Sequence, residues 1–104
     1  HMHATVRRYE GVDASRTNEL TTKVNETLLP KLSNVPGFKG YYLLDAGNGV
    51  FSSFSMFDNA QHADEATQLV ATWVRDEKFE SILPNPPKIS IGEVIAQKNG
   101  SPVA

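Results

Sequence analysis

The sequence contains no cysteine, and this absence excludes several kinds of chemistry. Disulfide bonds, a thiol nucleophile and thiolate metal ligands all require cysteine side chains. The absence also fits a reducing compartment, so we expect a cytoplasmic protein.

Long apolar runs and an excess of positive charge are also missing. No apolar stretch approaches the roughly 20 residues that span a bilayer, and the first residues contain no apolar core of a signal peptide. The formal net charge is −2, which provides no basic footprint for a nucleic-acid backbone or an anionic membrane. We therefore expect neither a membrane nor a nucleic-acid partner.

The 104 residues are enough for one compact domain. We interpret residues 1–3 as a cloning remnant and the natural start, because His1 precedes Met2. We expect the domain over residues 4–97 and a flexible tail over residues 98–104.

The first part of the chain predicts a strand and then a helix. Residues 4–10 are rich in β-favouring side chains, and Asp13 can cap a following helix. Pro30 should bend the last turn of that helix, and Pro36-Gly37 should end it. Apolar residues at steps of four predict its buried face: Leu20, Val24, Leu28 and Leu32.

The middle of the chain predicts a hairpin. Residues 38–46 and 50–57 are rich in aromatic and β-favouring residues. They flank Gly47-Asn48-Gly49, where glycine and asparagine tolerate the positive φ angles of a tight turn.

The last part predicts a second helix and a fourth strand. Asp58 and Gln61 form a capping-box-like start to this helix. Residues 83–88 contain three prolines and should form a stiff connector, and residues 89–97 should form the last strand. The apolar stripe of the helix is Ala63, Ala66, Val70, Trp73 and Val74.

The element order β-α-β-β-α-β predicts an α+β fold, the ferredoxin-like sandwich, in which a four-stranded antiparallel sheet carries two helices on one face. A sheet with one solvated face should alternate cleanly between apolar and polar residues. Here both phases of the strands are apolar, so we expect the second face to be buried in a homodimer.

The segment "LLPKLSNVPGFKGYYLL", a Gly/Asn turn and "FSSFSMFDNAQHADEA" resemble the dimeric α/β-barrel superfamily, which includes antibiotic-biosynthesis monooxygenase-like domains. The resemblance covers roughly residues 4–97. It implies a homodimer with a pocket between sheet and helices in each subunit. Its members include cofactor-free oxygenases, haem-degrading enzymes and isomerases, and a shared fold does not imply shared chemistry.

The haem-degrading branch of this superfamily does not match. Its asparagine, tryptophan and histidine positions fall at about Arg7, Ala66 and Arg75 of this sequence. We therefore expect no haem and no other cofactor. The "HADE" segment lacks the second histidine of a zinc-binding helix, so we also expect no metal site.

Two residues are candidates for catalysis, His62 and Arg7. Histidine is the side chain best suited to proton transfer at physiological pH, so His62 could carry protons from the second helix, or it could be an exposed first-turn histidine beside Asp58 and Asp64. Arg7 shares one phase of the first strand with Tyr9. Together they suit an anionic or enolate-like ligand if that phase faces a cavity.

These two residues of the first strand also have a purely structural interpretation. Arg7 could pair with Glu93 or Glu10, and Tyr9 could pack in the dimer interface. Trp73 lies at helical spacing and could be a core residue. The residues that we consider for a ligand pocket are Tyr9, Tyr41, Phe54 and Trp73.

The sequence thus predicts a small homodimeric domain that binds a small apolar or aromatic molecule between sheet and helices. One alternative is a cofactor-free monooxygenase or isomerase of the antibiotic-biosynthesis monooxygenase type. Another is a dimerisation or sensing module without catalysis. The residues alone do not decide whether the protein is an enzyme.

Overall fold

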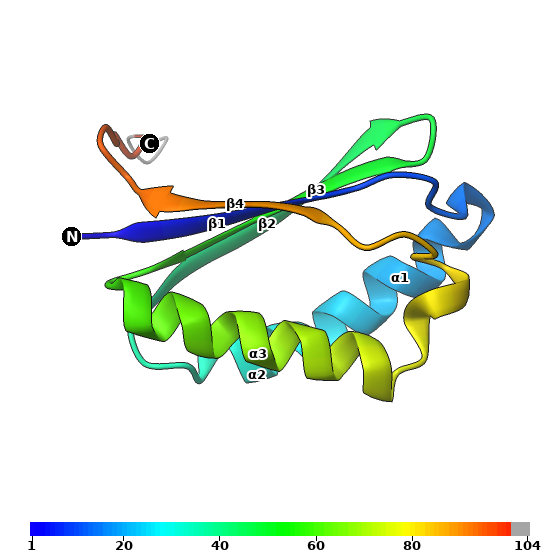
Figure 1. Ribbon diagram of the computed structural model, residues 1–104, viewed down its shortest axis with the longest axis horizontal. Helices are drawn as coiled ribbons and strands as arrows, with labels where there is room; N and C mark the ends of the chain where they lie inside the picture. Colours follow the sequence, from blue (N-terminus) through cyan, green and yellow to red (C-terminus); the bar gives the residue numbers. More distant parts are fainter. Residues whose placement is uncertain (101–104) are drawn as a thin grey trace.

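The computed structural model describes residues 1–100. The elements follow the order β-α-β-β-α-β, as the sequence predicts (Figure 1). Residues 101–104, the end of the predicted tail, lie outside the described residues. None of the helices within residues 1–100 has the length and apolar character needed to cross a membrane.

The four strands are β1 (His3–Tyr9), β2 (Phe38–Gly47), β3 (Val50–Phe57) and β4 (Lys88–Glu93). They form one antiparallel sheet with the order β2-β3-β1-β4. The two helical segments lie on the same face of this sheet (Figure 1). The structure therefore confirms the predicted ferredoxin-like sandwich.

The first helical segment is continuous and contains a π-helical turn in its middle. It runs through the 3₁₀ turn η1 (Ala14–Arg16), α1 (Thr17–Lys23), the π-helical turn η2 (Val24–Leu28) and α2 (Leu29–Ser33). The four apolar residues at steps of four are all buried, as predicted. Each step of four exceeds the 3.6 residues of an α-helical turn, and a π turn takes up the surplus.

Pro30 gives the π turn a second cause. Proline has no N–H to donate, and its ring crowds the carbonyl four residues earlier in an α-helix. In η2 the N–H of Leu29 instead bonds to the carbonyl of Val24, five residues earlier. Pro30 then occupies the first turn of α2, where no donor is required. The predicted bend at Pro30 is thus a π turn just before it.

The hairpin between β2 and β3 follows the predicted turn chemistry. Asn48 has φ 54° and Gly49 has φ 75°, both in the left-handed region. Such angles give the two-residue turn that matches the twist of paired strands.

Helix α3 (Ala60–Asp76) begins one residue later than the sequence predicts. The cap is Asn59, whose side-chain oxygen accepts the N–H of His62 at 2.9 Å. The side chain of Asp58 is engaged elsewhere, with its Oδ1 2.6 Å from Nδ1 of His62. The predicted inner stripe is confirmed at Ala63, Ala66, Val70 and Trp73, which are buried.

Strand β4 is shorter than the predicted 89–97. It ends at Glu93, opposite His3, where β1 begins. One further hydrogen bond, from the N–H of Val94 to the carbonyl of Met2 at 2.8 Å, closes the ladder. Beyond it the chain pairs with no other strand within residues 1–100. The chain turns away on the side opposite the helices (Figure 1).

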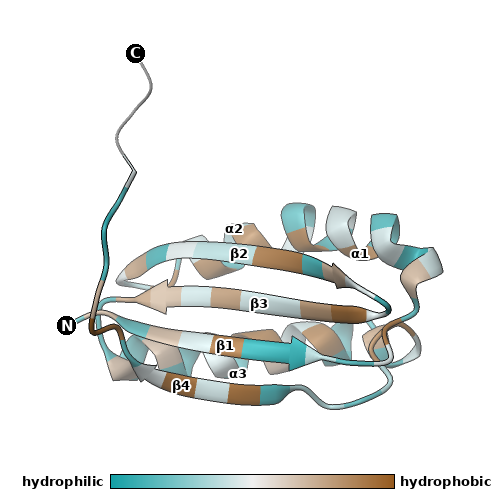
Figure 2. Ribbon diagram, turned by 90° about the horizontal axis from the view of Figure 1, so that it is seen from above, coloured by the Kyte–Doolittle hydropathy of each residue, from teal (hydrophilic) through white to brown (hydrophobic). Residues whose placement is uncertain are grey.

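The register decides which phase of each strand faces the helices. On β3, Phe51, Ser53, Ser55 and Phe57 are buried beneath the helices, and the residues between them lie on the other face. We call this other face the bare face; Figure 2 looks onto it. Its apolar residues occupy three neighbouring strands: Val6, Tyr42, Leu44, Phe54 and Met56.

Gly37 precedes β2 and lies in close contact with the side chain of Asp58, and substitution of this glycine tests that contact. It has φ 77°, and a Cβ there would lie 1.9 Å from Oδ1 of Asp58. Gly37→Ala should therefore lower the free energy of unfolding by about 1–3 kcal/mol, measured by urea denaturation at one protein concentration.

The matched control for this change is Gly100→Ala, because Gly100 lies outside the sheet and a Cβ there would meet nothing within 4 Å. This variant should stay within about 0.5 kcal/mol of the parent. Equal stability of the two variants would contradict the account of Gly37.

Candidate functional site

The candidate site lies on the helix-facing side of the sheet, at the centre of β1. Side chains of directly opposed residues in antiparallel strands lie on the same face. Arg7 is opposed by Ser53 on β3 and by Ile89 on β4, and Ser53 is opposed by Leu43 on β2. Serine is small, so it leaves room beside the long side chain of Arg7 under the helices.

Arg7 is a buried cation without a carboxylate partner in the part of the chain that the structure describes. It is 3% exposed, and its Nη2 donates to Oγ1 of Thr67 on α3 at 3.0 Å. The predicted alternative of a pair with Glu93 or Glu10 is wrong, since Glu10 pairs with Arg8 at 3.1 Å and Glu93 contacts His1. Four of the five guanidinium N–H groups thus have no protein acceptor within residues 1–100.

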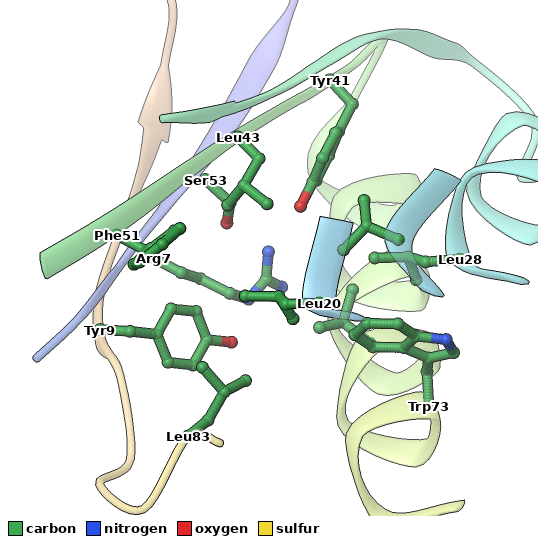
Figure 3. A pocket seen from close by; sticks show the side chains of 12 residues that line it. Arg7, Tyr9, Leu20, Leu28, Tyr41, Leu43, Phe51, Ser53, Trp73 and Leu83 are labelled. Carbon is green, nitrogen blue, oxygen red and sulfur yellow. The ribbon is translucent and has the colours of Figure 1, made fainter. Parts of the chain in front are cut away.

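Two phenols share the space around this cation. The side chains of Tyr9 and Tyr41 point inward toward the guanidinium of Arg7 (Figure 3). Burial raises the pKa of Tyr9, and the nearby charge of Arg7 opposes this shift. Burial also raises the pKa of Tyr41 to about 12, helped by Tyr9 and opposed by Arg7 and by hydrogen bonding to Ser53. Both phenols therefore stay neutral at physiological pH and can donate hydrogen bonds.

The charge on Arg7 persists despite its burial. Removal from water lowers the pKa of the guanidinium, and the two tyrosines act in the opposite direction. Arginine begins from a value so high that it stays protonated in proteins. The site thus combines one fixed positive charge with two neutral hydroxyl groups.

The space beside these groups has a narrow inner part and a wider outer part. The inner cavity has a volume of about 30 Å³, room for roughly two water molecules. It is lined by Arg7, Tyr9, Tyr41 and Ser53, together with apolar residues from both helical segments (Figure 3). The outer groove measures about 410 Å³ and lies against α3, β4 and the proline-rich connector. Arg7, Tyr9, Val70 and Leu83 line both parts.

Trp73 lines the inner cavity and is also part of the core. It is 4% exposed, and its ring lies 4.8 Å from that of Phe79 in a tilted arrangement. Its Nε1 donates to Oγ1 of Thr27 at 2.7 Å, and Thr27 donates in turn to the carbonyl of Lys23. Its N–H is therefore occupied by the protein, and the indole serves the cavity as a fixed apolar wall.

Two of the predicted site residues lie outside this constellation. Phe54 is on the bare face, opposed by Val6 and Tyr42, so it does not line the cavity. His62 is in the first turn of α3, beside Asp58, and does not line the cavity or the groove. Its hydrogen bond lowers the pKa of Asp58. The structure thus brings together Arg7, Tyr9, Tyr41 and Trp73.

Sequence reasoning missed two contributors, Thr67 and Leu83. Thr67 follows Ala63 by four residues and so extends the inner stripe of α3, which is the signal that could have indicated it. Leu83 lies in the connector before β4, where no periodicity applies. Within residues 1–100 no group of three or more metal-ligating side chains comes together.

Solved structures share this architecture at low sequence identity. The NE2512 protein of unknown function from Nitrosomonas europaea has a TM-score of 0.74 and 19% identity, over 97% of this chain and 96% of that chain. A candidate antibiotic biosynthesis monooxygenase from the same organism has a TM-score of 0.74 and 16% identity, over 95% of each chain.

A third structure holds a ligand. The ActVA-Orf6 monooxygenase of Streptomyces coelicolor, in complex with nanaomycin D, has a TM-score of 0.68 and 17% identity, over 96% of this chain and 92% of that chain. The resemblance to antibiotic-biosynthesis monooxygenase-like proteins is therefore confirmed, and at these identities it establishes the fold alone. No family profile and no curated protein matches the sequence.

Alkaline unfolding tests the buried position of Tyr41. Its folded-state pKa of about 12 lies above the value of about 10 for an unfolded chain. Between these values the unfolded state binds fewer protons, so the free energy of unfolding falls as pH rises, by at most about 1.4 kcal/mol per pH unit. Tyr41→Phe should make this fall less steep in urea denaturation.

The matched control is Tyr42→Phe, which removes a phenol from the bare face instead. A fall as steep in Tyr41→Phe as in the parent protein would show that Tyr41 ionises freely in the folded state.

Proposed function

We propose that this protein binds a small, largely apolar or aromatic molecule that carries an anionic oxygen, between its sheet and its helices. The observation that supports this most strongly is the buried guanidinium of Arg7, which meets no carboxylate within residues 1–100. An isolated charge is costly to bury, and a bound anion would offset that cost. Tyr9 and Tyr41 would donate further hydrogen bonds to the same oxygen.

The shape of the space supports the same class of ligand. The outer groove has the volume of a ligand pocket, for which about 300–1,000 Å³ is usual. Most of its wall is apolar, from Val70, Val74, Leu83, Ile89 and three prolines. The inner cavity holds only a few atoms. A ligand would therefore place its apolar body in the groove and its charged oxygen inward, against Arg7.

A pair of probes tests this proposal: 2-naphthoate and 2-naphthalenemethanol have the same ring system, and one of them is anionic. Isothermal titration calorimetry should show that the native protein binds the naphthoate at least about tenfold more tightly, the scale of a hydrogen bond to a charged group. Arg7→Met should remove this preference, because it keeps an apolar side chain of similar length.

Arg8→Met is the matched control. Arg8 is the neighbouring arginine, but it lies exposed on the opposite face and pairs with Glu10. This variant should keep the preference of the native protein. Equal binding of the two probes by the native protein would refute the proposal.

A second candidate is cofactor-free oxygenation of a phenolic aromatic compound. It is favoured by the fold shared with the ActVA-Orf6 monooxygenase and by Arg7, whose charge would stabilise a phenolate or enolate before it meets dioxygen. Dioxygen uptake by a mixture of the protein and anthrone separates this candidate from binding alone. An isomerase, or a sensing module without turnover, would bind without consuming dioxygen.

We also propose that the protein is a homodimer that buries the bare face. Tyr42 is 67% exposed and Leu44 is 52% exposed in the single subunit, and both adjoin the row formed by Phe54 and Val6. Soluble monomers rarely leave such contiguous apolar surface in water. A second copy packed sheet to sheet about a two-fold axis would cover it.

Phe54→Asp tests the dimer, since Phe54 lies in the middle of the bare face. Native mass spectrometry should show twice the chain mass for the parent protein and a single chain for the variant. Gln68→Asp, on the exposed side of α3, is the matched control and should stay dimeric. A dimeric Phe54→Asp protein would argue for another interface.

A further inference from the structure

The guanidinium of Arg7 is held by one hydroxyl group, that of Thr67. Nη2 of Arg7 donates to Oγ1 of Thr67 at 3.0 Å, across 60 positions of sequence. The same hydroxyl donates to the carbonyl of Ala63, one turn earlier in α3, at 3.2 Å. We infer that Thr67 is the positioning residue that orients Arg7 toward an anionic ligand. This inference rests on the proposed function.

The location of Thr67 suits this role. It lies on the inner side of α3, half-buried, and lines the outer groove but not the inner cavity. Arg7 lines both. The hydrogen bond to Thr67 therefore ties the guanidinium at the junction of groove and cavity, where the charged end of a ligand would lie.

An arginine side chain needs such a hydrogen bond to fix its orientation. Its several rotatable bonds give it large conformational freedom, and fixing it before binding lowers the entropy cost of each hydrogen bond to a ligand. The other groups close to Arg7 do not fix it, because Ser53 and the two tyrosines form no hydrogen bond with the guanidinium within residues 1–100. Loss of the Thr67 hydroxyl would thus leave Arg7 in the site without a defined orientation.

Thr67 acts through Arg7 and not on the ligand itself. A threonine hydroxyl has a single proton to donate, and here that proton is used by the carbonyl of Ala63. Its oxygen already accepts from Arg7. It therefore has no donor left for an anion, and its contribution should appear only when the ligand is charged.

The test compares Thr67→Val, Thr67→Ser and the native protein. Valine has the shape of threonine without the hydroxyl, and serine keeps the hydroxyl. Calorimetry with 2-naphthoate should give about tenfold weaker binding for Thr67→Val and recovery to within about threefold for Thr67→Ser. Binding of 2-naphthalenemethanol should change by less than about twofold in both, because a neutral probe does not use the orientation of the cation.

Thr5→Val is the matched control. Thr5 lies on the same strand as Arg7, faces the helices and is 1% exposed, yet its hydroxyl has no hydrogen-bond partner within residues 1–100. It removes the same atoms from the same layer without touching Arg7. This variant should bind both probes as the native protein does.

A measurement without ligand gives a second criterion. Nuclear magnetic resonance reports the rotation of the Arg7 guanidinium about its Cζ–Nε bond. Rotation should be slow in the native protein and in Thr67→Ser, and faster in Thr67→Val. If Thr67→Val does not fold, Thr67→Ala takes its place under the same criteria.

Three results would overturn the inference. The first is that Thr67→Val weakens both probes equally, which indicates a structural role alone. The second is that Thr67→Ser restores neither binding nor slow rotation. In both cases Arg7→Met would still remove the preference for the anion, so the proposed function would stand. The third is equal binding of both probes by the native protein, which would overturn the proposed function together with this inference.

Discussion

The structure depends on one geometric constraint, that two helices packed side by side can cover only one face of a four-stranded sheet. Everything that the subunit can bury by itself lies on that face: the core, the cavity and Arg7. The opposite face keeps an apolar surface centred on Phe54. The same constraint thus leaves an internal cavity on one face and an exposed apolar surface on the other, which the proposed homodimer would bury.

The interior of the covered face is polar where a simple core would be apolar. Thr5, Arg7, Ser53 and Ser55 are buried at the centre of the sheet, and the large apolar side chains lie at the two ends, with Phe51 and Phe57. The short side chains of Thr5, Ser53 and Ser55 leave space between the sheet and the helices, and the guanidinium of Arg7 fits there. Burial of a cation without a carboxylate partner costs stability, and the proposed anionic ligand would offset that cost.

Much of the fold could be predicted because its signals are local. The steps of four from Leu20 to Leu32, the Asn-Gly turn and the prolines after Leu83 each determine the backbone within a few residues. The predictions were wrong where a neighbour decided the outcome. The cap of α3 is Asn59 and not Asp58, because the side chain of Asp58 contacts His62, and β4 ends at Glu93 because that residue lies opposite the first residue of β1.

The candidate site was predicted only in part, for a physical reason. The sequence by itself determined the element order and placed Arg7 and Tyr9 in one phase of β1. Because both phases of the strands are apolar, alternation could not decide which of them the helices cover. Strand register and helix packing made that choice, which placed Tyr41 inside and Phe54 outside. The contact of Arg7 with Thr67 joins residues 60 positions apart and exists only once α3 lies across β1.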